Sequence, residues 1–116
     1  MGEVRFMFVR YEDAKVRKTG FEGVTFRTLA TGERIMLTVM HYEEGAVVSP
    51  HSHPNEQVGY VIRGKLRVRI GREEAILSEG DSYAVPAGET HSMVALEETY
   101  VVDTFSPPRE DYIERR

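Results

Sequence analysis

Apolar residues occur along the chain in short runs rich in β-branched and aromatic residues, broken by Gly, Pro and acidic residues. Turn signals such as Arg63-Gly64 and Pro86-Ala87-Gly88 separate most of these runs. No segment shows a convincing helical period. The pattern therefore predicts strands at Val4–Val9, Val24–Leu29, Arg34–Tyr42, Gln57–Arg63, Lys65–Ile70, Glu74–Leu77, Ser82–Val85, Met93–Ala95 and Thr99–Phe105.

Many short, closely spaced strands are typical of an all-β sandwich or barrel. The chain has 116 residues, which is the size of one domain, so we expect residues 1–116 to form a single domain. A short turn near Glu110–Glu114 is expected after Pro107-Pro108. Val4–Val9 is apolar for an N-terminal segment: it is expected to pair with a second subunit in a homodimer or to be the first strand of the monomer's own sheet.

Composition narrows the classes of partner. The chain has no cysteine, which excludes disulfides and thiolate metal ligands. The net charge is -4 with both signs interspersed, so nothing indicates a nucleic-acid partner. No run approaches the ~18–20 apolar residues of a membrane span, and the N-terminus lacks a signal-peptide pattern. A cytoplasmic location is the simplest expectation.

Two of the four histidines, His51 and His53, stand one residue apart. On a strand, positions i and i+2 face the same side, so both imidazoles could reach one ion. Taken alone, the pair could equally be two exposed histidines in a turn after Pro50. The context of the pair is what favours a metal site.

That context consists of two motifs: G-x5-H-x-H-x3-Q-x6-G over residues 45–64, and G-x5-P-x-G-x2-H over residues 80–91. Together they resemble the two signature motifs of the cupin superfamily. The sequence departs from the family pattern at Gln57, where a glutamate is usual, and at Ala95, where an asparagine is usual. The resemblance implies a cupin-type β-barrel, or jelly roll, with a metal in its mouth. Gly64 is expected at positive φ in a hairpin between two strands.

By the same resemblance, the metal ligands would be His51, His53, Gln57 and His91, around one divalent ion such as Zn, Ni, Mn or Fe. Glu56 is the alternative ligand, although neighbouring residues on a regular strand face opposite ways. His41 is expected near the barrel rim. Three imidazoles and an amide are neutral, so the ion would keep its full charge, which favours Lewis-acid chemistry on an anionic substrate.

Asp103 is a carboxylate within the apolar run Thr99–Phe105. Period two places it on one face with Val101 and Phe105, and that face could look inward or outward. The combination of HSHPNEQ and VVDTFSPPRED resembles the pectin-degradation cupins, which linearise unsaturated uronates. The resemblance implies Asp103 as the acid/base, Arg109 as a substrate contact and Phe105 as a pocket wall.

We therefore expect a metal-dependent enzyme of the isomerase or lyase type that acts on an anionic sugar acid. The expected reaction opens the ring of a 4,5-unsaturated uronate to its 5-keto form. Two alternatives stay open from the sequence: a metal-dependent oxygenase, and a non-catalytic cupin that binds a sugar acid or another small ligand.

Overall fold

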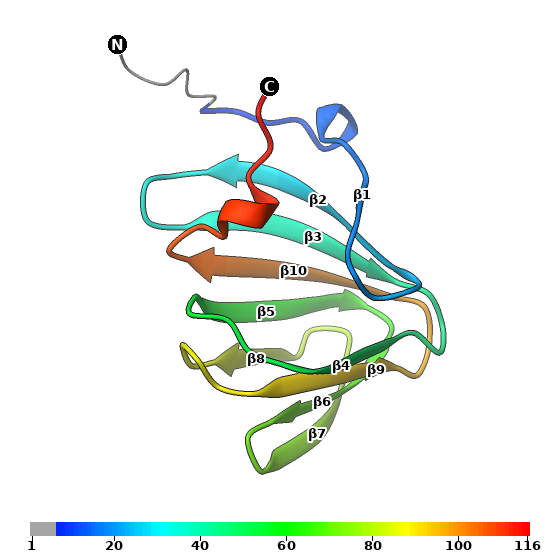
Figure 1. Ribbon diagram of the computed structural model, residues 1–116. Helices are drawn as coiled ribbons and strands as arrows, with labels where there is room; N and C mark the ends of the chain where they lie inside the picture. The colour runs from blue at the N-terminus through cyan, green and yellow to red at the C-terminus, as the bar shows by residue number, and fades with distance from the viewer. Residues whose placement is uncertain (1–6) are drawn as a thin grey trace.

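The computed structural model describes residues 7–116 (Figure 1). Almost every regular element in this part of the chain is a strand. The strands are β1 (Arg17–Lys18), β2 (Val24–Thr31), β3 (Met36–Tyr42), β4 (Val47–His51), β5 (Glu56–Arg63), β6 (Lys65–Ile70), β7 (Glu73–Ser78), β8 (Ser82–Val85), β9 (His91–Ala95) and β10 (Thr99–Ser106). Two short 3-10 helices, η1 (Tyr11–Asp13) and η2 (Glu110–Tyr112), accompany them.

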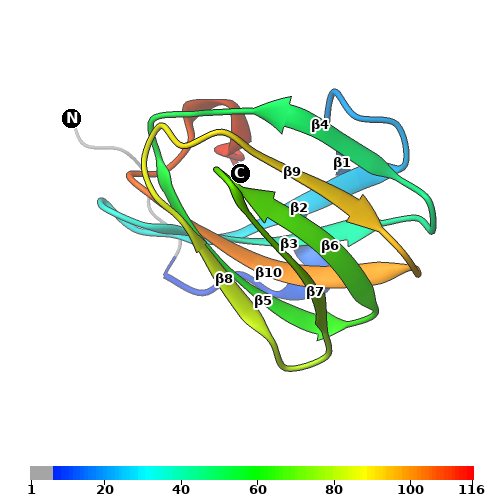
Figure 2. The ribbon, with the colours of Figure 1, turned by 90° about the horizontal axis from the view of Figure 1, so that it is seen from below.

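The strands form two antiparallel sheets, which face each other in Figure 2. The order is β1-β2-β3-β10-β5-β8 in the six-stranded sheet and β4-β9-β6-β7 in the four-stranded one. The last long strand, β10, lies between β3 and β5, although both come much earlier in the sequence. The all-β fold predicted from the sequence is confirmed.

Alternation along the strands builds the core between the sheets. In β10, every second residue from Thr99 to Phe105 is buried, and β6 and β9 alternate in the same way. The inward side chains include Phe26, Met40, Val61, Leu66, Met93 and Val101. Asp103 is buried in this layer, so the inward alternative for its face holds.

Most predicted strands are present, with ends that differ by one or two residues. Two short strands, β1 and β4, were not predicted. β4 contains Pro50, which cannot donate a ladder hydrogen bond, but it is tolerated because β4 lies at the edge of its sheet. Of the predicted strand Val4–Val9, residues 4–6 lie outside the described residues, and Met7–Val9 forms no strand.

The turns that were predicted from glycines occur where expected. Gly64 joins β5 to β6 with a φ of 105°, and a Cβ atom there would meet the Glu98 carbonyl oxygen and Thr99. Gly88, with a φ of 78°, donates its N–H to the His53 carbonyl oxygen at 2.9 Å. This bond joins the second motif to the first.

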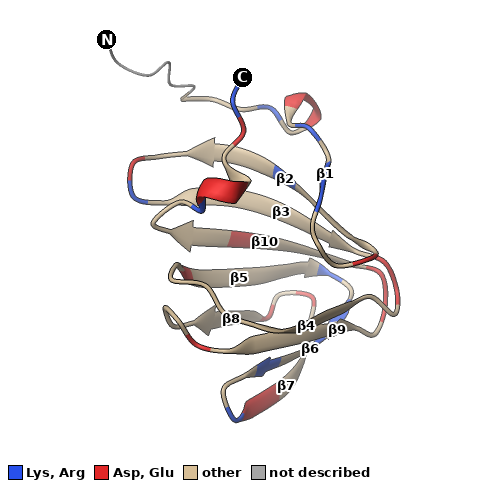
Figure 3. Cartoon of the chain, in the orientation of Figure 1, with Lys and Arg blue, Asp and Glu red and all other residues tan. Residues whose placement is uncertain are grey.

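Charged residues of both signs are spread over the two sheets rather than gathered on one (Figure 3). The acidic band within β10 is Asp103, since β10 has no other acidic residue. Within residues 7–116, no helix is long and apolar enough to cross a membrane. The predicted homodimer stays a prediction.

Candidate metal centre

Three histidines meet at one end of the space between the sheets. His51 ends β4 and His91 begins β9, and the two are directly paired in the ladder between these strands. His53 lies in the loop between β4 and β5, not on a strand, so the predicted strand spacing is not what directs it inward. The turn that holds Gly88 against His53 brings it toward His91 instead.

One ring nitrogen from each of His51, His53 and His91 lies within 4.8 Å of the others. The ring centroids of His51 and His91 are 4.3 Å apart, and those of His53 and His91 are 4.9 Å apart. Three imidazoles at this separation could hold a metal ion. His41 lies on β3, outside this cluster. Its Nε2 contacts the Glu98 carboxylate at 2.7 Å.

The second nitrogen of each imidazole is already engaged. Nδ1 of His51 lies 3.0 Å from the Ser49 carbonyl oxygen, Nδ1 of His53 lies 3.0 Å from that of Asn55, and Nδ1 of His91 lies 2.9 Å from that of Glu89. A carbonyl oxygen can only accept, so each Nδ1 must carry the proton. In a neutral imidazole with its proton on Nδ1, the Nε2 lone pair is available as a ligand, which is how metal-binding histidines are usually oriented.

The protonation of these rings suits a metal. Burial lowers the pKa of His91 to about 4, and burial followed by the positive charge of Arg109 lowers the pKa of His53. Both imidazoles are thus neutral near pH 7, and a neutral imidazole is the form that binds a metal ion.

Gln57 faces the histidines from β5. Its side chain is only 4% exposed, whereas neighbouring Glu56 is exposed on the opposite side of the strand. The Gln57 Oε1 lies 3.0 Å from Nε2 of His53. Since Nδ1 of His53 holds the proton, both of these atoms are hydrogen-bond acceptors, and their close approach is what a shared cation would stabilise. The donor set therefore fits a metal ion.

Asp103 lies beside this donor set. Asp103 is 1% exposed, and Tyr83 donates its hydroxyl to Oδ1 at 2.7 Å. Burial raises the pKa of Asp103 to about 6, although the Tyr83 hydrogen bond, the neighbouring Gln57 amide and the charge of Arg109 act in the opposite direction. Asp103 is therefore a carboxyl group that changes charge near neutral pH.

Two residues that determine the position of Asp103, Gly59 and Tyr83, were not identified from the sequence. Gly59 is paired with both Asp103 and Tyr83 on the neighbouring strands. A Cβ atom on Gly59 would overlap the Tyr83 ring and lie 2.5 Å from Asp103 Oδ1, so only glycine lets the two side chains meet. The sequence did contain a signal for Tyr83, because it alternates with Val85 and so shares the buried face of β8. A buried tyrosine hydroxyl needs a polar partner.

Arg109 approaches the site from the segment after β10. Its guanidinium lies 5.3 Å from the centre of the Phe105 ring and 3.9 Å from that of Tyr112, and it forms an ion pair with Asp111. Arg109 and Phe105 both line an inner cavity of about 30 Å³ together with His51, Gln57, His91 and Asp103. Five of the six predicted site residues thus line this cavity, and the sixth, His53, lies at its outer side, where it lines the neighbouring cleft and contacts Phe105.

Comparison with known proteins identifies the family. Residues 38–105 match the model of the cupin domain, and this range is more than half of the chain. The chain belongs to the cupin family. The cupin signature motifs seen in the sequence contribute the three clustered histidines.

This cupin is 35% identical over 94 residues to the pectin degradation protein KdgF of Dickeya dadantii (strain 3937), covering 79% of this chain and 86% of that protein. The structure of KdgF from Halomonas sp. matches with 31% identity and a TM-score of 0.84, covering 91% of this chain and 97% of that one. The oxalate decarboxylase OxdC of Bacillus subtilis (strain 168) is 32% identical over 105 residues, covering 84% of this chain but 27% of that longer protein.

The histidine cluster makes a direct prediction about metal content. Each of the single replacements His51→Ala, His53→Ala and His91→Ala should remove most of the bound metal, because each deletes one imidazole from a small donor set. The measurement is metal per chain by mass spectrometry after equilibration with a divalent ion. His41→Ala is the matched control and should retain the metal. Full metal content in all three cluster variants would contradict the site.

The buried carboxyl group makes a prediction about stability in metal-free protein. Folding raises the Asp103 pKa from 3.8 to about 6, so the folded state binds this proton more tightly and stability is lost as pH rises through this interval. Asp103→Asn removes that loss. Between pH 4.5 and pH 7.5, the unfolding free energy of Asp103→Asn should therefore rise by about 2 kcal/mol relative to that of the wild type.

Urea denaturation in the presence of chelator at the two pH values measures this shift. His91, whose pKa is lowered by burial, also makes stability depend on pH, but it is present in both proteins and cancels in the difference. A difference that does not change with pH would show that Asp103 has an ordinary pKa.

Proposed function

We propose that this cupin is a metal-dependent enzyme that opens the ring of a 4-deoxy-4,5-unsaturated hexuronate and converts it to the 5-keto open-chain form. The observation that carries the proposal is the position of Asp103: a buried carboxyl group, with its pKa raised toward neutrality, beside Gln57 and in one cavity with His51 and His91. Similarity to two proteins named KdgF, one of them described as a pectin degradation protein, supports a substrate of this class.

The reaction needs one group that both accepts and returns a proton. The Asp103 carboxylate accepts the proton of the anomeric hydroxyl as the bond between C1 and the ring oxygen breaks, which leaves an aldehyde at C1. The carboxyl group then gives a proton to C4, the double bond moves to the former ring oxygen, and C5 becomes a ketone. A pKa of about 6 suits both halves, since an efficient acid/base has a pKa near the operating pH.

Tyr83 assists by holding the carboxyl group in place. Its hydroxyl caps Oδ1 of Asp103 and stays neutral, because burial and then the Asp103 charge raise the pKa of Tyr83 well above its usual value. The carboxyl group is therefore fixed in orientation while it exchanges protons.

Arg109 and the metal ligands share the task of binding the anion. The guanidinium of Arg109, which is paired with Asp111 in this structure, would pair with the substrate carboxylate by charge-assisted hydrogen bonds. His51, His53, His91 and Gln57 would hold the divalent ion, and when bound it supplies Lewis-acid stabilisation of negative charge on substrate oxygens. Because all four ligands are neutral, they leave the positive charge of the site undiminished.

The proposal is tested with purified, metal-loaded protein and an unsaturated uronate. Loss of the absorbance of the conjugated alkene should be faster than in buffer, and Asp103→Asn should lower kcat by ~10²–10⁴ because it keeps the shape but cannot shuttle the proton. Metal content of the variant is measured in parallel, so that lost metal is not mistaken for lost chemistry. No acceleration by the metal-loaded wild type would refute the proposed reaction, and unimpaired turnover by Asp103→Asn would remove Asp103 from it.

A second prediction concerns the neutral ligand. Gln57→Glu should tighten metal binding by adding an anion, and should slow the reaction because the charge of the ion is partly neutralised. Metal affinity is measured by competition with a chelator, and turnover with the same assay as above. Glu56→Gln is the control, since Glu56 points outward and its charge change should leave metal affinity unaltered. Unchanged affinity and rate in Gln57→Glu would exclude Gln57 as a ligand.

A further inference from the structure

Two spaces of very different size meet at Arg109. The inner cavity that holds Asp103, Gln57 and His91 has a volume of about 30 Å³, enough for one or two water molecules. The outer cleft, between the C-terminal segment and the β2–β3 turn, has a volume of about 1070 Å³, which is ample for a sugar. Among the described residues, Arg109 is the one that lines both spaces.

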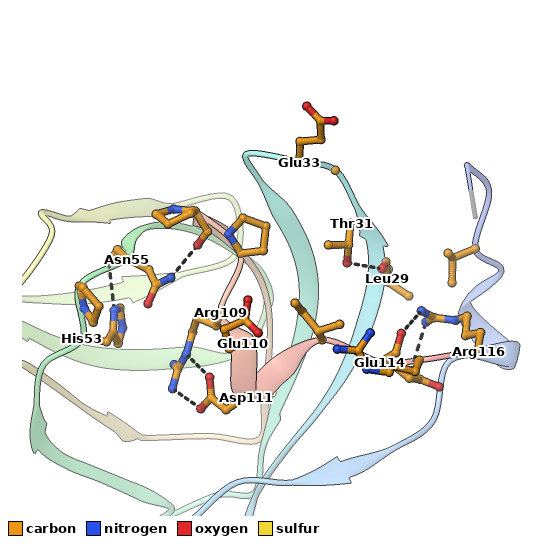
Figure 4. A pocket seen from close by; sticks show the side chains of 17 residues that line it. Leu29, Thr31, Glu33, His53, Asn55, Arg109, Glu110, Asp111, Glu114 and Arg116 are labelled. Atoms are coloured by element: carbon orange, nitrogen blue, oxygen red, sulfur yellow. Dashed lines mark hydrogen bonds and ion pairs between the residues drawn. The ribbon is translucent and has the colours of Figure 1, made fainter. Parts of the chain in front are cut away.

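Asp111 holds Arg109 in this position. Its carboxylate accepts two hydrogen bonds from the guanidinium, from Nη2 at 2.9 Å and from Nε at 3.3 Å. Figure 4 shows the two side chains pointing toward each other on the side of the cleft where His53 and Asn55 lie. The guanidinium carbon lies over the Tyr112 ring, 3.9 Å from its centre. A bidentate pair of this kind is also the arrangement that a substrate carboxylate would adopt on Arg109.

The two partners differ in freedom. Arg109 is largely buried, with a side chain only 16% exposed between the Phe105 and Tyr112 rings, whereas the Asp111 side chain is 64% exposed. Asp111 can therefore turn into solvent without breaking the fold around Arg109. Its backbone is anchored separately, since the Asp111 carbonyl oxygen accepts a hydrogen bond from Arg17 at 2.9 Å.

We propose that Asp111 is an internal carboxylate that occupies Arg109 until the carboxylate of an entering uronate takes its place. Asp111 is thus a positioning residue that acts through Arg109: it lowers the affinity of the cleft for acids in general and holds Arg109 between the cleft and the inner cavity. A neutral sugar has no group that can replace Asp111, so the exchange selects for acids. This inference rests on the proposed role of Arg109 in binding an acid substrate.

The experiment uses the metal-loaded full chain and D-glucuronate as the probe, with binding measured by calorimetry at low salt. Asp111→Asn should raise the affinity by about two- to five-fold, the value of a partly exposed ion pair. Glu110→Gln is the matched control on the same short helix: it removes the same charge, but Arg109 is paired with Asp111 and not with Glu110. Glu110 also lines the cleft, so its variant should raise the affinity less than Asp111→Asn does, because only Asp111 is paired with Arg109.

Two further variants make the test specific. In an Arg109→Ala background, Asp111→Asn should have no effect, because Asp111 acts only through Arg109. Asp111→Ser repeats the test with a smaller side chain, and circular dichroism checks the fold of each protein. The inference is overturned if neither Asp111 variant raises affinity, if Glu110→Gln gives the same rise, if the rise persists without Arg109, or if glucuronate binds neither wild type nor variants.

Turnover separates this inference from the proposed function. If the wild type processes the unsaturated uronate, Asp111→Asn should lower KM with kcat nearly unchanged, which a merely structural role would not produce. If the wild type shows no turnover but the glucuronate affinities change as expected, the reaction is refuted and the carboxylate exchange stands. If turnover is normal and Asp111→Asn changes no affinity, only the exchange is refuted.

Discussion

The pairing of β10 with both β3 and β5 is the constraint on which the site depends. It joins the end of the chain to the middle of the six-stranded sheet and fixes the register in which Asp103 lies opposite Gly59 and Phe105 opposite Gln57. In antiparallel strands, directly opposed residues face the same side, so this register places an acid, an amide and an aromatic ring on one inner surface. A shift of β10 by one residue would turn Asp103 and Phe105 outward, away from Gln57.

The histidine cluster depends on a second pairing, in the other sheet. The β4–β9 ladder sets His51 opposite His91, and the turn at Gly88 binds the His53 carbonyl oxygen. Asn55 extends this support, since its carbonyl oxygen accepts the Nδ1 proton of His53 while its side-chain amide donates to the Pro107 carbonyl oxygen at 2.7 Å. The loop that carries His53 is thus tied to the segment that carries Arg109.

The charges of the site are few and each is balanced locally. His53 and His91 are neutral, Gln57 is neutral, and Asp103 is held by Tyr83 in a setting where burial favours its protonated form. Arg109 brings a positive charge that the ion pair with Asp111 offsets. Within a low-dielectric interior this balance lets one proton or one substrate carboxylate change the electrostatics of the whole site.

The sequence by itself determined the all-β class, most strands and the turns at Gly64 and Gly88, because these follow from local periodicity and backbone freedom, and its resemblance to the cupin motifs implied the three clustered histidines. It left the inward face of β5 open: Val58, Tyr60 and Ile62 alternate as a core face would, yet they are exposed, and Gln57, Gly59 and Val61 face inward. It likewise missed β4 because of Pro50, and it did not show that Tyr83 reaches Asp103 across Gly59. Only the tertiary structure decided these points, since which side of a strand is buried depends on what the opposite sheet supplies, and that information lies in residues far apart along the chain.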